Sequence, residues 1–153
     1  MYILTVVLLA FVFPVISILT DVFLFKSASS TMYLVGKWFV FWGVGIRFFT
    51  AGLRQSITPR FTAEKIFGFK TDEPLVFVQE LGFANISSGL LGILTIFDGN
   101  WILPSAIIGG SFYGLAGIKH LTRSGRSSTE NVTTYSDLLM SIILLVYVAR
   151  SII

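Results

Sequence analysis

The sequence contains no cysteine and a single histidine, His120, among its 153 residues. Without cysteine the chain forms no disulfide, thiolate metal site or iron–sulfur cluster, and it offers no cysteine nucleophile. One histidine also excludes a multi-histidine zinc or haem site within the chain. Because no nucleophile motif or cofactor fingerprint is present, we predict no cofactor and no metal ion, and we favour a role that is not enzymatic.

Charged residues are scarce. They make up 12% of the chain, whereas 54% of the residues are hydrophobic and the mean hydropathy is +0.84. A soluble domain of this length needs far more polar surface, so the composition indicates an integral membrane protein. Loop lysines and arginines that orient membrane helices explain the net charge of +3, and no nucleic-acid partner is expected. Membrane lipids are the expected partners, with a homo-oligomer or a larger membrane complex left open.

Five apolar segments approach or exceed the length of about 20 residues that a membrane-spanning helix needs. They lie at residues 2–25, 31–54, 75–97, 101–120 and 135–152. The sequence therefore predicts an all-α integral membrane bundle, a single domain over residues 1–153. It has five transmembrane helices, or four if the first segment does not span. The first segment lacks a basic region and a cleavage site, so we expect it to be retained.

Positive charge is distributed unevenly between the two sides of this bundle. The loops after the second and fourth segments contain seven lysines and arginines, at positions 54, 60, 65, 70, 119, 123 and 126. The other side has three, at positions 26, 37 and 150. The positive-inside rule predicts a multi-pass protein with the N-terminus inside and the C-terminus outside, by default in a prokaryotic inner membrane. Within the first of these loops, "TPRFTAEKIFGF" fits a short amphipathic helix on the membrane surface or an ordinary structured loop.

A charged residue interrupts the second apolar segment in "GIRFFTAGLRQ". A charge at bilayer depth costs roughly 2.5–3.5 kcal/mol and normally faces protein or water. Small and polar residues recur here at spacings of 7, 4, 3 and 4, at Gly36, Gly43, Arg47, Thr50 and Arg54. This spacing places them on one face of a helix. We therefore expect Arg47 to point into the bundle.

Glu80, in the third segment, is the expected partner of Arg47 because both lie at a similar depth below the same boundary. We predict a buried Arg47–Glu80 ion pair, whose role is to specify which helices meet rather than to add net stability. Asn85 lies near the middle of the same segment, where its amide needs a hydrogen-bond partner.

The fourth segment contains a stripe of small residues, Ala106, Gly110, Gly114 and Gly117, that ends at His120. Gly110-x-x-x-Gly114 fits the close-contact motif of membrane helices, so we expect the second, third and fourth segments to pack tightly. His120 is interpreted as structural, with proton handling as the alternative.

The fifth segment begins with Thr134-x-x-Asp137, which predicts a variant of the capping box with the acid at the helix N-terminus. The alternative is an ion pair of Asp137 with His120 or Lys119. The predicted polar cluster, in the cytoplasmic half of the bundle, comprises Arg47, Gln55, Glu80, Asn85, His120 and Asp137.

Three stretches, "WGVGIRFFTAGLRQSITP", "VQELGFANISSGLLGIL" and "GLAGIKHL" followed by "YSDLLMSIILL", resemble an uncharacterised family of small prokaryotic membrane proteins, a domain of unknown function. The resemblance implies a compact helical bundle in which the six residues of the polar cluster match the family's polar pattern, and it implies no established activity. In size and glycine-rich helices the chain is more loosely similar to DoxX-like membrane proteins, some of which are associated with quinone-linked oxidoreductases.

Three functions follow from this pattern. The favoured one is a structural or accessory bundle, or a bundle that binds a small ligand, with a buried Arg47–Glu80 centre. The alternative is a proton-linked transporter or channel that uses Glu80 and His120. A further alternative is a quinone- or lipid-associated subunit of a membrane oxidoreductase.

Overall fold

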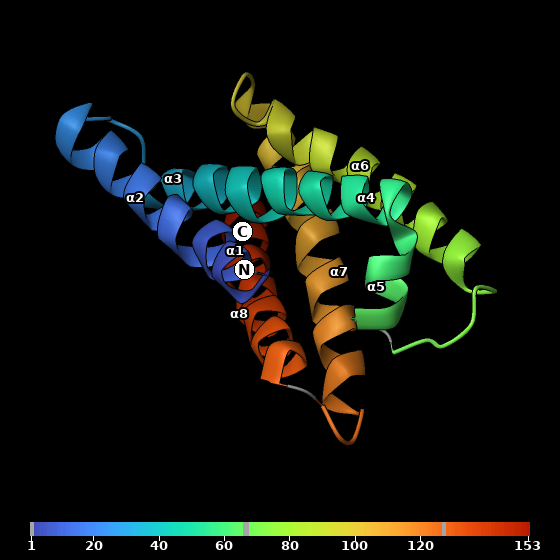
Figure 1. Ribbon diagram of the computed structural model, residues 1–153. Coiled ribbons are helices and arrows are strands. Elements are labelled where there is room, and N and C mark those ends of the chain that lie inside the picture. The colour runs from blue at the N-terminus through green and yellow to red at the C-terminus, as the bar shows by residue number, and fades with distance from the viewer. Residues whose placement is uncertain (1, 66–67, 127) are drawn as a thin grey trace.

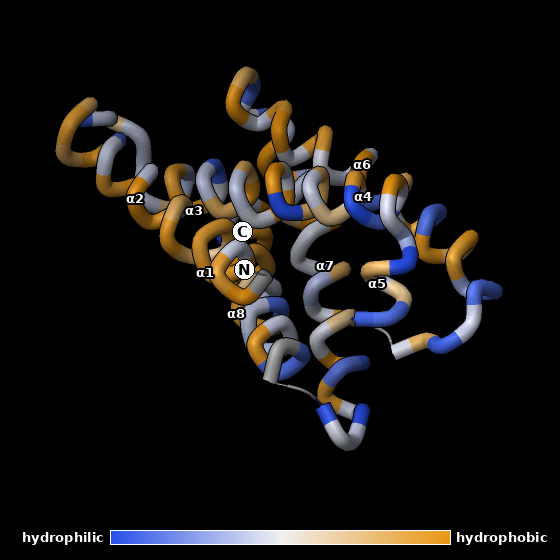
Figure 2. The backbone as a smooth tube through the Cα atoms, in the orientation of Figure 1, coloured by the Kyte–Doolittle hydropathy of each residue, from blue (hydrophilic) through white to orange (hydrophobic). Residues whose placement is uncertain are grey.

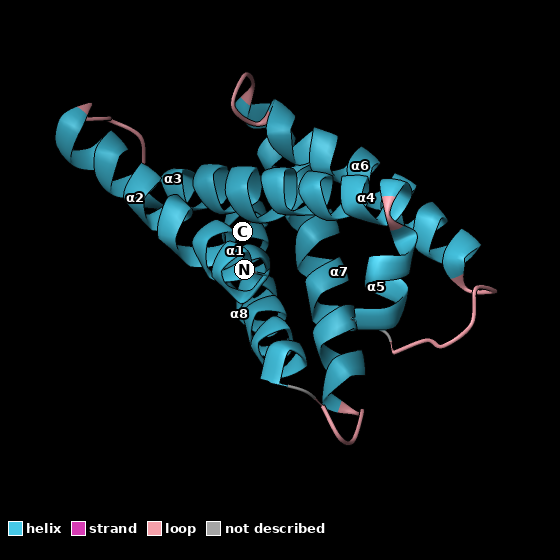
Figure 3. Ribbon diagram, in the orientation of Figure 1, coloured by secondary structure: helices cyan, strands magenta, loops and turns pink. Residues whose placement is uncertain are grey.

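In the computed structural model, which describes residues 2–65, 68–126 and 128–153, every regular element is helical (Figure 1; Figure 3). The first long helix is made of α1 (Tyr2–Val7), η1 (Leu8–Val12), α2 (Phe13–Leu19) and η2 (Thr20–Leu24). The second long helix is made of α3 (Thr31–Phe39), η3 (Val40–Ile46) and α4 (Arg47–Ile57). The remaining elements are α5 (Pro59–Lys65), α6 (Leu75–Leu94), the 3-10 turn η4 (Gly99–Trp101), α7 (Ile102–Leu121) and α8 (Ser128–Ile152). The elements η1, η2 and η3 are π-helical.

Within the described residues, five helices are long and apolar enough to cross a membrane, as many as the sequence predicts. They run over Ile3–Leu24, Thr31–Ile57, Leu75–Leu94, Gly99–Leu121 and Glu130–Ile152. Many large apolar side chains point outward; Phe97 is 81% exposed and Leu115 is 72% exposed. Figure 2 shows hydrophilic residues concentrated around α5 and in the loops that precede α6 and α8. So much exposed apolar surface is unfavourable in water and compatible with lipid.

The fifth helix differs from its prediction at its start. It begins at Ser128, seven residues before the predicted position 135. Thr134 is therefore inside the helix, where its Oγ1 donates a hydrogen bond to the Glu130 carbonyl at 2.7 Å. The predicted capping box at Thr134 and Asp137 is wrong, because a hydroxyl bonded to the carbonyl four residues earlier is compatible with a continuing helix.

The stretch "TPRFTAEKIFGF", between the second and third apolar helices, was predicted to be either a short helix or a structured loop. The structure has a short helix there. This helix, α5, covers Pro59–Lys65, with Thr62 and Ala63 buried. Ile66 and Phe67, which completed the predicted apolar face, lie outside the described residues. Whether α5 lies on a membrane surface stays a prediction.

The second long helix and α6 are in backbone contact. The buried face of α6 repeats at spacings of 4, 3, 4 and 3, at Val78, Gly82, Asn85, Gly89 and Gly92. A Cβ atom on Gly52 would lie 2.6 Å from the Gly82 carbonyl oxygen, and one on Gly89 would lie 2.5 Å from the Phe49 backbone nitrogen. Glycine on both sides therefore sets the separation of these two helices.

The opposite side of the bundle is built by α7 and α8. Ser141 Oγ donates a hydrogen bond of 2.8 Å to the Gly110 carbonyl, and Gly117 lies against Leu138. The small-residue stripe of the fourth apolar helix is thus a packing face, as predicted, but it packs on the fifth helix. Two glycines of the second long helix also face α8, since Gly36 lies against Tyr147 and Gly43 against Met140.

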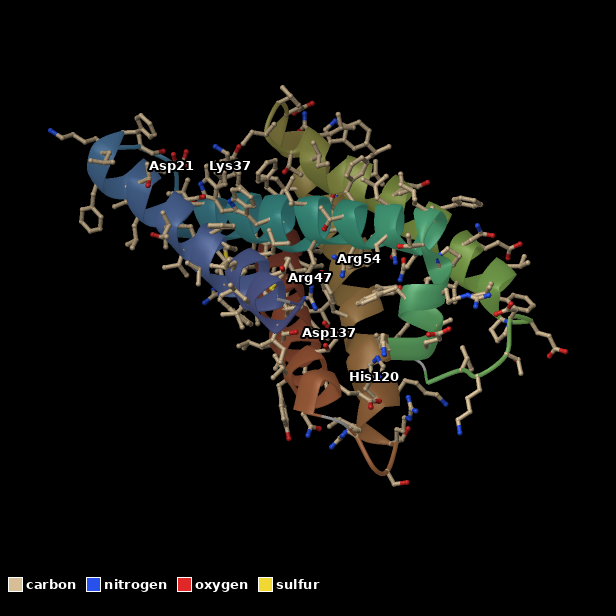
Figure 4. The ribbon with its side chains drawn as sticks, viewed as in Figure 1. Asp21, Lys37, Arg47, Arg54, His120 and Asp137 are labelled. Carbon is tan, nitrogen blue, oxygen red and sulfur yellow. The ribbon has the colours of Figure 1, made fainter. Side chains whose placement is uncertain are left out.

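Indole groups attach the first long helix to the second. Trp42 Nε1 donates to Ser17 Oγ at 3.0 Å, and Trp38 Nε1 donates to Asp21 Oδ2 at 2.8 Å. Lys37 Nζ lies 3.6 Å from the same Asp21 oxygen. Figure 4 shows Asp21 and Lys37 side by side, at the end of the bundle away from His120. The first segment is therefore an integral part of the bundle.

We predict that Gly89→Ala destabilises the fold. The added methyl group meets the backbone of Phe49, which no side-chain rotation relieves, and overpacking of this kind costs about 1–3 kcal/mol. The midpoint of thermal unfolding in detergent is expected to fall. Ala84→Val adds more volume on an exposed face of the same helix and is expected to leave the midpoint within error. Equal midpoints for the two variants would contradict the close contact.

Candidate functional site: a polar cavity between the helices

The centre of the site is an ion pair between Arg47 and Asp137. Arg47 Nη2 lies 2.7 Å from Asp137 Oδ1, and it also donates to Ser136 Oγ at 3.3 Å. The two charged side chains are 11% and 7% exposed. The guanidinium carbon stands 4.8 Å from the centre of the Tyr113 ring, whose hydroxyl donates to the Gly43 carbonyl. Arg47 is thus held by charge, hydrogen bonds and a cation–π contact.

The predicted Arg47–Glu80 pair is wrong. Glu80 lies on the exposed face of α6, two residues away from the buried positions Val78 and Gly82. The correct partner was missed because its depth was underestimated. With α8 beginning at Ser128, Asp137 lies nine residues into the helix, about 13 Å at 1.5 Å per residue. Arg47 lies at a matching depth, ten residues from the end of α4.

Arg47 follows directly after the π-helical segment η3. Gly36, Gly43 and Arg47 share one face, as predicted, but this face meets α8. The contact with α6 uses the neighbouring face, at Gly45 and Gly52. Deviations from α-helical hydrogen bonding are frequent next to functional sites.

A second polar pair connects α4 to α6. Asn85 Nδ2 donates a hydrogen bond of 2.7 Å to Gln55 Oε1, and both residues are buried, at 6% and 9% exposure. This contact provides the partner that the Asn85 amide was expected to need. A buried amide pair of this kind fixes the relative position of two helices.

His120 lies near the end of α7, close to the start of α8. Its Nδ1 is 3.6 Å from Glu130 Oε1, and Arg123 Nη1 is 3.4 Å from the same oxygen. Asp137 forms its ion pair with Arg47, so the alternative pairing of Asp137 with His120 or Lys119 is also wrong. Glu130, which was assigned to a loop, is the acid beside His120.

Most of these groups line a partly open cavity of about 1070 Å³. Its walls come from the first long helix, from α4, α5, α6 and α7, and from α8 at Thr133 and Asp137. Five of the six residues of the predicted polar cluster line it: Arg47, Gln55, Asn85, His120 and Asp137. Glu80 does not. Figure 4 shows Arg47, Arg54, Asp137 and His120 in the region between α4, α7 and α8.

The cavity contains cationic groups that the predicted polar cluster did not include. Arg54, Lys119 and Arg123 line it together with Arg47. Their positions near the ends of α4 and α7 fit a residue at a membrane boundary and a residue that lines a cavity equally well. Charge alone therefore does not distinguish these two roles. Within the described part of the chain, no group of three or more histidine, aspartate and glutamate side chains is placed to hold a metal ion.

Comparison with known proteins gives a family without an activity. A model for a family of unknown function, DUF6790, matches residues 1–152. The chain belongs to this family. No curated protein and no solved structure matches the chain, and the looser resemblance to DoxX-like proteins finds no support in these comparisons. A function for this DUF6790 protein therefore has to be argued from its own site.

We predict that Asp137→Asn strongly destabilises the protein, because it leaves the buried Arg47 guanidinium without a counter-charge. Removing one partner of a buried pair costs about 3–5 kcal/mol, and the thermal unfolding midpoint in detergent reports the loss. Glu80→Gln is the matched control, the same change of acid to amide at an exposed position, and is expected to change stability by about 0.5 kcal/mol or less. A larger loss of stability from Glu80→Gln than from Asp137→Asn would contradict this result and support the Arg47–Glu80 pair instead.

Proposed function

We propose that the protein is a multi-pass membrane protein that binds a small amphipathic molecule in the cavity between its helices. The cavity carries this proposal. Its volume of about 1070 Å³ is slightly above the range of about 300–1,000 Å³ that ligand sites occupy. Apolar walls with a few convergent polar groups are the usual composition of such sites.

Membrane insertion is supported by the five long apolar helices and by their outward-facing phenylalanine and leucine side chains. Loop charge favours an orientation with the N-terminus inside and the C-terminus outside. Arg54 and Lys119 lie in the last turns of α4 and α7, next to the loops that this orientation places in the cytoplasm. The basic end of the cavity then lies at the cytoplasmic surface.

The polar pairs around the cavity suit binding because they hold its walls in place. Arg47 and Asp137 join the second long helix to α8, and Gln55 and Asn85 join it to α6. Side chains locked by their own partners form a preorganised site. Binding is favoured over a proton path through Glu80 and His120 because Glu80 lies outside the cavity.

A photoreactive ligand tests the proposal. The protein is reconstituted in lipid nanodiscs, a fatty alcohol with a diazirine in its chain is added, and the labelled residues are mapped by mass spectrometry. We predict concentrated labelling of the cavity walls, on residues of the first long helix, α4 and α7. Competition with unlabelled fatty alcohol is expected to reduce this labelling.

Ala116→Trp supplies the decisive variant, because Ala116 lines the cavity and an indole there fills part of it. We predict that it lowers cavity labelling by about fivefold or more, equivalent to roughly 1 kcal/mol. Leu115→Trp is the control, since Leu115 is 72% exposed and faces away from the cavity. Labelling spread evenly over outward faces, and unchanged by Ala116→Trp, would refute ligand binding in the cavity.

A further inference from the structure

We infer that the molecule bound in the cavity is an amphiphile with an oxyanion headgroup, a phosphate or a carboxylate, which is held by Arg54 and Lys119. Its apolar chain lies beyond the Arg47–Asp137 pair, among the residues of the first long helix. This inference rests on the proposed function and adds the chemical class of the ligand.

The charge balance of the lining points to an anion. Four basic side chains line the cavity and one carboxylate, Asp137, opposes them. Asp137 is engaged by Arg47, and Arg123 lies 3.4 Å from Glu130. Within the described residues, Arg54 and Lys119 form no ion pair. Both side chains are exposed on the lining of the cavity, so an oxyanion can reach them and gain charge-assisted hydrogen bonds from both.

Arg54 is placed for this role by its own contacts. Its guanidinium carbon stands 4.9 Å from the centre of the Phe61 ring of α5, and Phe61 also lines the cavity. Stacking on an aromatic ring leaves the edge of a guanidinium available for hydrogen bonds in its plane. Guanidinium groups bind carboxylates and phosphates through two parallel hydrogen bonds, and an ammonium group adds a point charge.

The other end of the cavity is apolar. Its lining there includes Phe13 of the first long helix and Ile46, which directly precedes Arg47. The Phe13 ring lies 4.9 Å from Trp42, which precedes Arg47 by five residues. Phe13 is therefore on the far side of Arg47 from Arg54, so the cationic and apolar linings are separated along the second long helix. A headgroup at Arg54 places an attached chain toward Phe13, past an Arg47 whose charge Asp137 neutralises.

Two probes of equal chain length separate the headgroup from the chain. One is the diazirine fatty alcohol and the other is the corresponding diazirine alkyl phosphate, each titrated in nanodiscs of neutral lipid. We predict that the alkyl phosphate labels the cavity at a concentration about tenfold lower than the alcohol does, because charge-assisted hydrogen bonds exceed neutral ones. The double variant Arg54→Gln/Lys119→Gln is expected to remove this difference, because it weakens labelling by the alkyl phosphate much more than labelling by the alcohol.

The control removes equal charge at the same end of the protein. Arg60 and Lys65 are exposed residues of α5 and do not line the cavity, so Arg60→Gln/Lys65→Gln is expected to keep the tenfold preference. If both double variants lose the preference equally, general surface charge explains it and the assignment to Arg54 and Lys119 is wrong.

The remaining outcomes separate this inference from the proposed function. Equal labelling by the two probes, still blocked by Ala116→Trp, overturns the oxyanion headgroup and leaves ligand binding intact. Absence of cavity labelling by either probe overturns both. Inorganic phosphate distinguishes a lipid from a free anion. If inorganic phosphate competes at the same concentration as alkyl phosphate, the alkyl chain adds nothing to binding, and the inference of an amphiphilic ligand is wrong. If inorganic phosphate competes only weakly, the result supports an amphiphilic ligand.

Discussion

The ion pair between Arg47 and Asp137 is the constraint on which the rest of the structure depends. It joins two residues that are 90 positions apart in the sequence, and both charged side chains are nearly buried, where neither is well tolerated without the other. A shift of α8 along the second long helix would separate these two groups, so the pair favours the observed register. Gly36 and Gly43 lie on the same face and allow α8 to approach closely on one side of the pair. The pair thus acts as a specificity device, the best-attested use of buried charge.

The cavity begins at the point along the second long helix where its glycines no longer contact α8. At Arg47 the face that carried glycines carries a long side chain, stacked on Tyr113, and from there the lining includes Arg54, Lys119 and His120. On its other face the second long helix keeps backbone contact with α6 through Gly45, Gly52 and their partners. One helix therefore has a closely packed side and an open, polar side. This asymmetry gives a rigid wall on which a ligand site can be built.

Much of the fold follows from hydropathy and spacing, because lipid-facing helices need long apolar segments. All five apolar helices, the inward orientation of Arg47 and the small-residue face of the fourth apolar helix follow from such patterns. The partner of Arg47 does not. Two acids, Glu80 and Asp137, were available, and the choice depended on where α8 begins. The stretch before Asp137 is rich in serine and threonine, which favour loops in isolation. Burial against the rest of the bundle, as at Thr134 and Ser136, offsets this tendency, and the Thr134 hydroxyl finds its partner within the helix.

Dipolar recoupling by solid-state NMR, on protein in lipid bilayers, measures the central contact directly. Arginine is labelled with ¹⁵N in its guanidinium group and aspartate with ¹³C in its carboxyl group, and the Asp137→Asn protein supplies the background to subtract. A separation of 2.7 Å between Arg47 Nη2 and Asp137 Oδ1 predicts strong dephasing that disappears in the variant. The contrary result is dephasing that is unchanged by Asp137→Asn, together with dephasing in glutamate-labelled protein that requires Glu80. That result would mean that Arg47 pairs with Glu80 and not with Asp137.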